Sequence, residues 1–167
     1  MRNPDFGHPS IRELLTTFSE VLERLRERGV VRSSNNPVAD YCEALVARAL
    51  KLERLGRSNK GCDAVDPVSK KRYEIKGRRI TKHNSSTQLS VIRALDHRHF
   101  DYLVGVLFDE NFTVTHAHCI PFEVVESSAD YREGVNGWII HLRPSLWENS
   151  EVSDITAEVQ KAQMDWA

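Results

Sequence analysis

The sequence predicts a single-domain α/β fold in which a mixed β-sheet is flanked by helices. Three observations support this fold class. Two short strand-like runs, residues 62–66 and 72–79, form a hairpin pattern between helical segments. The run from Tyr102 to Phe108 is continuously apolar, which is typical of a strand covered on both faces. The 167 residues contain no repeat or linker, so we expect one domain over residues 1–167 that buries its own core.

Composition narrows the class of protein. The three cysteines, Cys42, Cys62 and Cys119, are scattered and lack metal-ligand spacing, so we expect free thiols in a reducing cytoplasm. No run has signal-peptide or membrane-spanning length, so we expect a cytoplasmic protein without a membrane partner. The formal net charge is −1, but the charges are unevenly placed. The tail is acidic, whereas the hairpin carries Lys70, Lys71, Arg72, Lys76, Arg78, Arg79 and Lys82.

Two helices are expected before the hairpin. The capping-box pattern Ser10-Ile11-Arg12-Glu13 and an apolar stripe at helical spacing predict an N-terminal helix over about residues 10–28. This stripe indicates a core or an interface, so the helix can equally cover the sheet or join two copies of the chain. Asn36-Pro37 predicts the start of a second helix that reaches about Leu55.

The hairpin brings charged groups to one face. If residues 62–66 and 72–79 pair about the turn Pro67–Lys70, Asp63 lies roughly opposite Glu74. Strand side chains alternate between faces, so Lys76 points the same way as Glu74. Two neighbouring carboxylates favour a hard cation such as Mg²⁺ between them. The other acidic residue of the hairpin, Asp66, lies at the turn and is interpreted as a turn former. A charged solvent face is the simpler alternative.

After the hairpin the chain alternates between helices and strands. Asn84 can cap a short helix that carries Leu89 to Leu95. The apolar run 102–108 is expected to be a central strand that forms a hairpin with residues 112–119. A short helix is expected from Pro121 through Val125, and a strand over 138–142 after the turn Asn136-Gly137. The chain is expected to end in an acidic helix and tail over about residues 150–167, capped at Ser153-Asp154. This terminal helix is expected to fray or to dock a partner.

These residues resemble the PD-(D/E)XK nuclease superfamily, whose members have a restriction-endonuclease-like fold. The matching positions are Asp63, the Glu74-x-Lys76 pair and Glu43, an upstream acid near the middle of the second helix. The resemblance covers a core of about residues 37–119, with the N-terminal helix as an addition. Cys62 stands where the family often has proline, and no first strand is evident between the second helix and Cys62.

The resemblance implies a Mg²⁺-dependent nuclease, most simply a DNA endonuclease of restriction type that also accepts Mn²⁺ and can form a homodimer. Asp63, Glu74 and the Ile75 carbonyl would hold the metal, with support from Glu43, and Lys76 would position a water or stabilise charge on the phosphate. Gln88 is a possible accessory residue. The residues expected to contact the nucleic-acid backbone, with DNA favoured over RNA, are Lys71, Arg78, Arg79 and Lys82.

Two other functions stay open. The first is a catalytically silent nuclease-like fold that binds nucleic acid or a protein partner, with the acidic residues retained as structure. The second is an interaction domain supported by zinc, because His97 and His99, and His116, His118 and Cys119, are ligand types suited to zinc. Their spacing matches no zinc motif.

Overall fold

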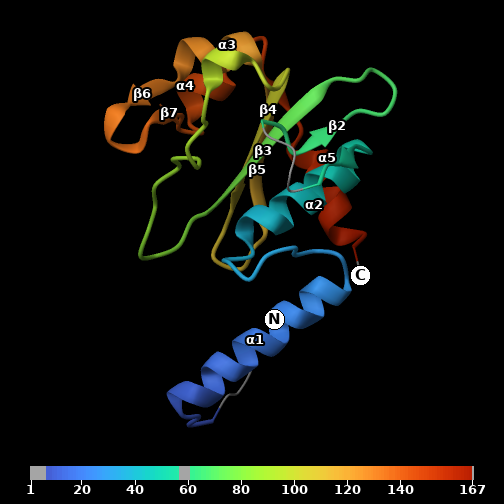
Figure 1. Ribbon diagram of the computed structural model, residues 1–167, viewed down its shortest axis with the longest axis vertical. Helices are drawn as coiled ribbons and strands as arrows, with labels where there is room; N and C mark the ends of the chain where they lie inside the picture. The colour runs from blue at the N-terminus through green and yellow to red at the C-terminus, as the bar shows by residue number, and fades with distance from the viewer. Residues whose placement is uncertain (1–6, 57–60, 167) are drawn as a thin grey trace.

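A six-stranded mixed sheet forms the centre of the computed structural model, which describes residues 7–56 and 61–166 (Figure 1). The strand order in these residues is β1-β2-β3-β4-β5-β8. Strands β3 and β4 run parallel, and every other neighbouring pair is antiparallel. The predicted α/β class with a mixed sheet is therefore confirmed. The strands are β1 (Glu53–Arg54), β2 (Ala64–Val65), β3 (Arg72–Arg79), β4 (Tyr102–Phe108), β5 (Val114–Pro121) and β8 (Ser153–Asp154).

Helices α2 (Val38–Leu50) and α5 (Thr156–Met164) cover one face of the sheet. Cys42, Leu45 and Val46 of α2 pack there against Ile75 and the alternate residues of β4. A Cβ atom on Gly77 would lie 2.8 Å from the Cβ of Cys42, so only glycine lets α2 approach β3 this closely.

The end of α2 differs from the prediction. The helix stops at Leu50 rather than near Leu55, because Lys51 adopts a left-handed conformation with φ 56° and ψ 39°. Residues Glu53–Arg54 then form β1, which pairs with β2. The first strand that was not evident from the sequence therefore lies inside the segment predicted to be helical.

The C-terminal helix is also displaced. It begins at Thr156, because Ser153–Asp154 form the edge strand β8 beside β5. The Asp154 Oδ1 atom still accepts the Thr156 N–H at 2.8 Å. The helix packs on its own chain, because Val159 is buried and Trp166 stacks on Tyr41 with ring centroids 6.1 Å apart.

The opposite face is covered mainly by irregular and short elements. These are helices α3 (Phe122–Ser128) and α4 (Pro144–Trp147), the two-stranded sheet β6 (Asp130–Arg132) and β7 (Gly137–Ile139), with the 3₁₀ turns η1 (Leu95–His97) and η2 (Glu133–Val135). The strand predicted over 138–142 is thus shorter and starts one residue earlier.

The prediction of a helix after Asn84 is wrong. The segment is extended instead: the Leu89 N–H donates to the Ile140 carbonyl at 3.0 Å, and Ile92 and Trp138 exchange two hydrogen bonds of 2.9 Å. Leu89, Ile92 and Leu95 have helical spacing, but tertiary backbone pairing overrides it. Gly105 leaves room for Leu89 to reach the sheet, since a Cβ there would lie 3.1 Å from its side chain.

Helix α1 (Ile11–Glu27) extends from one end of the molecule, away from the sheet (Figure 1). The capping box is confirmed: the Glu13 N–H donates to Ser10 Oγ at 3.3 Å, and the Ser10 N–H donates to the Glu13 carboxylate at 2.7 Å. Leu22 is its buried residue. Among the described residues, no helix has the length and apolarity needed to cross a membrane.

Candidate active site

The hairpin β2–β3 places Asp63 beside Glu74. Ala64 pairs with Tyr73, and the Asp63 N–H donates to the Tyr73 carbonyl at 2.8 Å, so Asp63 lies opposite Glu74 as predicted. The Ile75 N–H donates to Asp63 Oδ2 at 2.7 Å, which fixes the carboxylate against the edge of β3. Asp66 forms the turn, where its Oδ1 atom accepts the N–H groups of Val68 and Ser69 at 2.7 and 3.0 Å. The predicted register and the role of Asp66 are therefore confirmed.

Glu74 and Lys76 lie on the same face of β3, as the alternation of side chains requires. Lys76 Nζ is 2.8 Å from Glu74 Oε1. Their side chains are only 17% and 10% exposed, with Glu74 the more exposed of the two. These charges are thus largely withdrawn from water, unlike those of a solvated strand face.

The pKa of the Asp63 carboxyl group is strongly raised. Burial, followed by the negative charge of Glu74, raises the pKa of Asp63 to about 7, although the hydrogen bond from Ile75 opposes the shift. Two carboxylates therefore share a site that contains one ammonium group, Lys76. A cation bound between them would relieve the repulsion and lower the pKa of Asp63.

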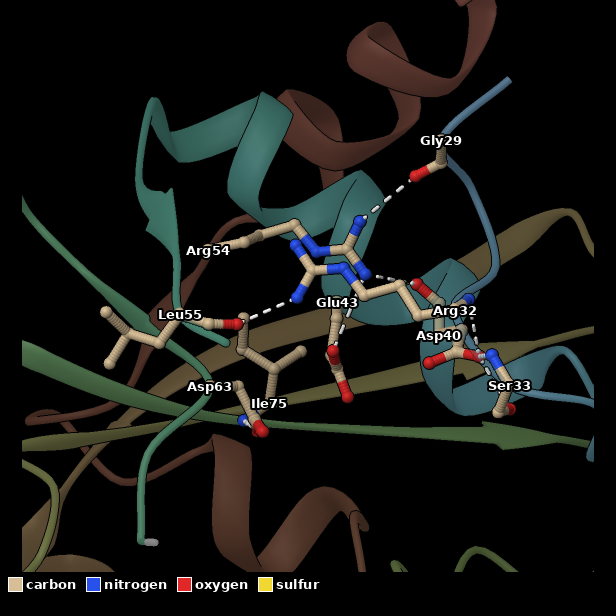
Figure 2. A network of polar contacts seen from close by, with 9 residues as sticks. All are labelled: Gly29, Arg32, Ser33, Asp40, Glu43, Arg54, Leu55, Asp63 and Ile75. Atoms are coloured by element: carbon tan, nitrogen blue, oxygen red, sulfur yellow. Dashed lines mark hydrogen bonds and ion pairs between the residues drawn. The ribbon is translucent and has the colours of Figure 1, made fainter. Parts of the chain in front are cut away.

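Glu43 enters the same region from α2. Its Oε2 atom lies 3.5 Å from Arg54 of β1, and burial raises the pKa of its carboxyl while Arg54 opposes the shift. Glu43 and Asp63 both line a polar cavity of about 280 Å³. Figure 2 shows the two side chains entering this region, Glu43 from α2 and Asp63 from the position just before β2. Glu43, expected only as an upstream acid on the second helix, therefore faces this cavity.

Arg54 and Asp40 hold this side of the site together, and no sequence pattern points to either residue. Arg54 donates to the carbonyl oxygens of Gly29 and Asp40 at 3.2 and 3.3 Å (Figure 2). The Asp40 carboxylate accepts the N–H groups of Arg32 and Ser33 at 3.0 and 2.8 Å. This network ties the connection between α1 and α2 to β1, and it orients Glu43.

A second cavity, of about 570 Å³, adjoins Asp63 and Glu74 on the side of the extended segment. Its other walls include Arg93, His97 and His99. The sequence offered the two histidines only as zinc ligands, but the fold brings them beside the carboxylate pair. The cavity supplies space and hydrogen-bonding groups next to that pair.

The donor atoms at the hairpin fit a hard divalent cation. The N–H and C=O of a strand residue point to the same side, so the Ile75 carbonyl is directed toward the side where Asp63 accepts the Ile75 N–H. Asp63, Glu74 and this carbonyl offer oxygen ligands of the kind that Mg²⁺ and Mn²⁺ accept. Within residues 7–56 and 61–166, no three His, Cys, Asp or Glu side chains are grouped to hold a metal ion. Glu43 lies beside Arg54 in the smaller cavity that Asp63 also lines.

The predicted nucleic-acid contacts fall into two groups. Lys71 and Lys82 are exposed beside the hairpin. Arg78 donates to the Ser86 carbonyl at 3.1 Å, and Arg79 lies over the Phe112 ring at 4.3 Å from its centroid. Gln88, expected on a helix, lies instead in the extended segment, where it pairs with His141. The lysines are the freer candidates for phosphate contacts.

The histidines of β5 and the three cysteines have different surroundings from the carboxylate pair. His116 and His118 stack on Trp147, with ring centroids 4.8 and 4.9 Å away. His118 is buried, and burial lowers the pKa of its imidazole. The three cysteines are free, and burial raises the pKa of each thiol, that of Cys119 to about 11. Neither set has the arrangement of a zinc site or the ionisation of a thiolate nucleophile.

No protein-family model matches the chain, and no curated protein matches its sequence. The likeness to the PD-(D/E)XK superfamily therefore depends on the carboxylates and lysine of the hairpin.

Proposed function

We propose that the chain is a Mg²⁺-dependent nuclease of the PD-(D/E)XK superfamily that hydrolyses phosphodiester bonds, with DNA as its favoured substrate. The observation that carries the proposal is the Asp63–Glu74 pair on adjacent strands, with Lys76 Nζ 2.8 Å from Glu74. The pKa of about 7 for Asp63 supports it, since a raised carboxylate pKa in a cavity is typical of functional sites.

Asp63, Glu74 and the Ile75 carbonyl would hold the ion, which neutralises charge on the phosphate and lowers the pKa of the attacking water. Lys76 would position the water or stabilise charge on the phosphate. Glu43 adds negative charge behind Asp63, and Arg54 restrains it. Lys71 and Lys82, with Arg78 and Arg79, lie along the expected path of the phosphate backbone.

The cellular compartment is part of the same proposal. We place the protein in the cytoplasm, where a reducing environment keeps Cys42, Cys62 and Cys119 as free thiols.

The test is cleavage of supercoiled plasmid, linear duplex, single-stranded DNA and RNA by the purified chain with Mg²⁺, Mn²⁺ or EDTA. Asp63→Asn and Lys76→Ala are compared with Asp66→Asn, a matched control in the exposed turn of the same hairpin. We expect metal-dependent cutting that the first two substitutions abolish and the control retains. Cutting that survives both would come from another site or from a contaminant, and would refute the proposal.

A silent nuclease-like fold remains the second candidate, because Lys76 and Arg54 already neutralise part of the acidic charge at Glu74 and Glu43. Gel-shift measurements on the same proteins decide between the two. Binding of DNA without cutting, unchanged by Asp63→Asn, would favour the binding module. Cutting lost together with unchanged binding would favour the nuclease.

A further inference from the structure

Helix α1 exposes an apolar stripe that the rest of the described chain leaves uncovered. Five large side chains on it are 45–79% exposed, while Leu22 alone is buried. A single exposed leucine is ordinary, but a continuous stripe along one helix indicates an interaction surface. The exposed residues are Ile11 (79%), Leu14 (45%), Leu15 (62%), Phe18 (50%) and Val21 (50%).

The two halves of α1 have different surroundings. The C-terminal half forms one wall of an open groove of about 560 Å³, whose walls include Val21, Leu25, Tyr41 and Phe112. The N-terminal half, with Ile11 and Leu15, lies beyond this groove and extends from the molecule (Figure 1). One half is thus an apolar ridge, and the other borders an apolar groove.

The apolar residues of the stripe have the same spacing in both directions along the helix. Its apolar residues are symmetric about Phe18, because each residue before Phe18 has an apolar counterpart at the same distance after it. A helix turned end to end therefore presents the same stripe. The counterparts are Ile11 with Leu25, Leu14 with Leu22, and Leu15 with Val21.

We propose that α1 joins two copies of this chain as an antiparallel helix pair, with the two-fold axis at Phe18. The ridge of each copy then enters the groove of the other, so both halves are buried by one symmetric contact. Ile11 of one copy faces Leu25 of the other, and the two Phe18 side chains meet. This inference concerns a surface apart from the carboxylate site and does not depend on the proposed nuclease activity.

The area is sufficient for a weak to moderate dimer. With side chains on the order of 150–200 Å² each, the five exposed fractions amount to roughly 500 Å² per copy. A pair buries about 1,000 Å² before the groove walls are counted, close to the lower limit of specific interfaces.

Charge favours a second copy over a lipid surface. A helix that binds an anionic membrane needs a basic polar face. The polar positions of Ile11–Glu27 instead hold three arginines and four glutamates, which gives this segment a formal charge of −1. The pairs Glu23–Arg26 and Arg24–Glu27 already link several of these charges within the helix.

The first test measures mass by sedimentation equilibrium over about 1 to 100 µM protein. We expect a dimer for the native chain and a rise of at least about 100-fold in the dissociation constant for Leu15→Glu, because a charge would be buried in an apolar contact. Thr16→Glu is the matched control, since Thr16 is the next exposed residue and lies outside the stripe. A native chain that stays monomeric, or a dimer indifferent to Leu15→Glu, overturns the proposal.

The second test concerns the direction of pairing. Phe18→Cys is expected to form a disulfide between copies under mild oxidation, whereas Ile11→Cys is not, because the two copies of residue 11 lie at opposite ends of the pair. The native chain, with its own three cysteines, is the background control. Cross-linking through residue 11 would show a parallel pair and overturn the antiparallel arrangement.

Discussion

Strand β3 presents an apolar face to α2 and a charged face to the other side of the sheet. Ile75 is buried against Cys42 and Leu45, and Gly77 allows α2 to approach. Glu74 and Lys76 alternate with these residues and face away from α2. Adjacent positions in one strand thus belong to two environments.

The difference teaches how to separate stability from chemistry in this chain. The apolar face contributes through packing, which any close-fitting side chain can provide. The charged face withdraws an acid–base pair from water, which costs solvation free energy that packing does not return. We therefore expect substitutions on the two faces to have separable effects.

The largest effect is expected from Glu74→Gln. This change removes one proposed metal ligand and the partner of Lys76, so cleavage should fall about 100- to 1,000-fold. The Asp63 carboxyl ionises more readily once the negative charge of Glu74 is gone, so the buried Lys76 would keep an opposite charge nearby. The free energy of unfolding should therefore fall by about 1 kcal/mol, less than the about 3–5 kcal/mol expected for an unpaired buried charge. Cleavage rates and urea unfolding of the same preparations test both parts. Unchanged cleavage would remove Glu74 from the proposed site.

The neighbouring substitution Ile75→Ala should show the opposite behaviour. It leaves the backbone carbonyl in place but opens a cavity against α2, which should lower the free energy of unfolding by about 2–4 kcal/mol. Cleavage per folded molecule should stay within a few-fold of the native rate. Denaturant titration and activity at low temperature measure the two. If activity fell as far as in Glu74→Gln while the fold survived, the faces of β3 would not be separable.

Local patterns were sufficient to predict several elements of the fold. The capping box at Ser10, the apolar run 102–108 and the hairpin around Pro67 are each decided by neighbouring residues. The position of the Asp63 carboxyl group opposite that of Glu74 was predicted from the hairpin register and side-chain alternation alone. These features need no information about distant parts of the chain.

Backbone pairing between distant segments determines the elements that local sequence patterns predicted wrongly. Leu89 and Ile92 have helical spacing, yet their backbone groups pair with residues about 50 positions later. Strand β1 was hidden in a helical pattern that ends when Lys51 turns left-handed. The restraint of Glu43 by Arg54, and the position of His99 beside Asp63, depend on those same unpredicted segments.

The pH dependence of the free energy of unfolding tests the charged side of the hairpin separately from its apolar side. The pKa of Asp63 is raised to about 7 in the folded state, above its unfolded value. Between about pH 4 and 7 the folded state keeps a proton that the unfolded state loses, so stability falls as pH rises and then levels off. Relative to Asp63→Asn, the native chain should lose on the order of 4 kcal/mol across this range, because each pKa unit between about 4 and 7 contributes about 1.4 kcal/mol.

Urea unfolding at several pH values, without divalent ions, measures this difference. Adding Mg²⁺ above pH 7 should restore stability to the native chain but not to Asp63→Asn, since the ion would bind the ionised pair. Asp66→Asn serves as the control, because hydrogen bonds from Ser69 and Val68 lower the pKa of Asp66. Parallel pH profiles for the native chain and Asp63→Asn would show that Asp63 is not shifted.

The smallest effect is expected from Lys82→Ala, beyond the end of β3. Its exposed ammonium group would make one phosphate contact, so DNA affinity should fall a few-fold, uniformly across sequences, and the salt slope by about 1. Lys161→Ala, exposed on α5, is the control and should leave both unchanged. Arg79→Ala should instead weaken the fold, because Arg79 lies over Phe112 and donates to the Glu110 carbonyl. Equal losses of DNA affinity for Lys82→Ala and Lys161→Ala would mean that DNA follows general charge rather than the hairpin face.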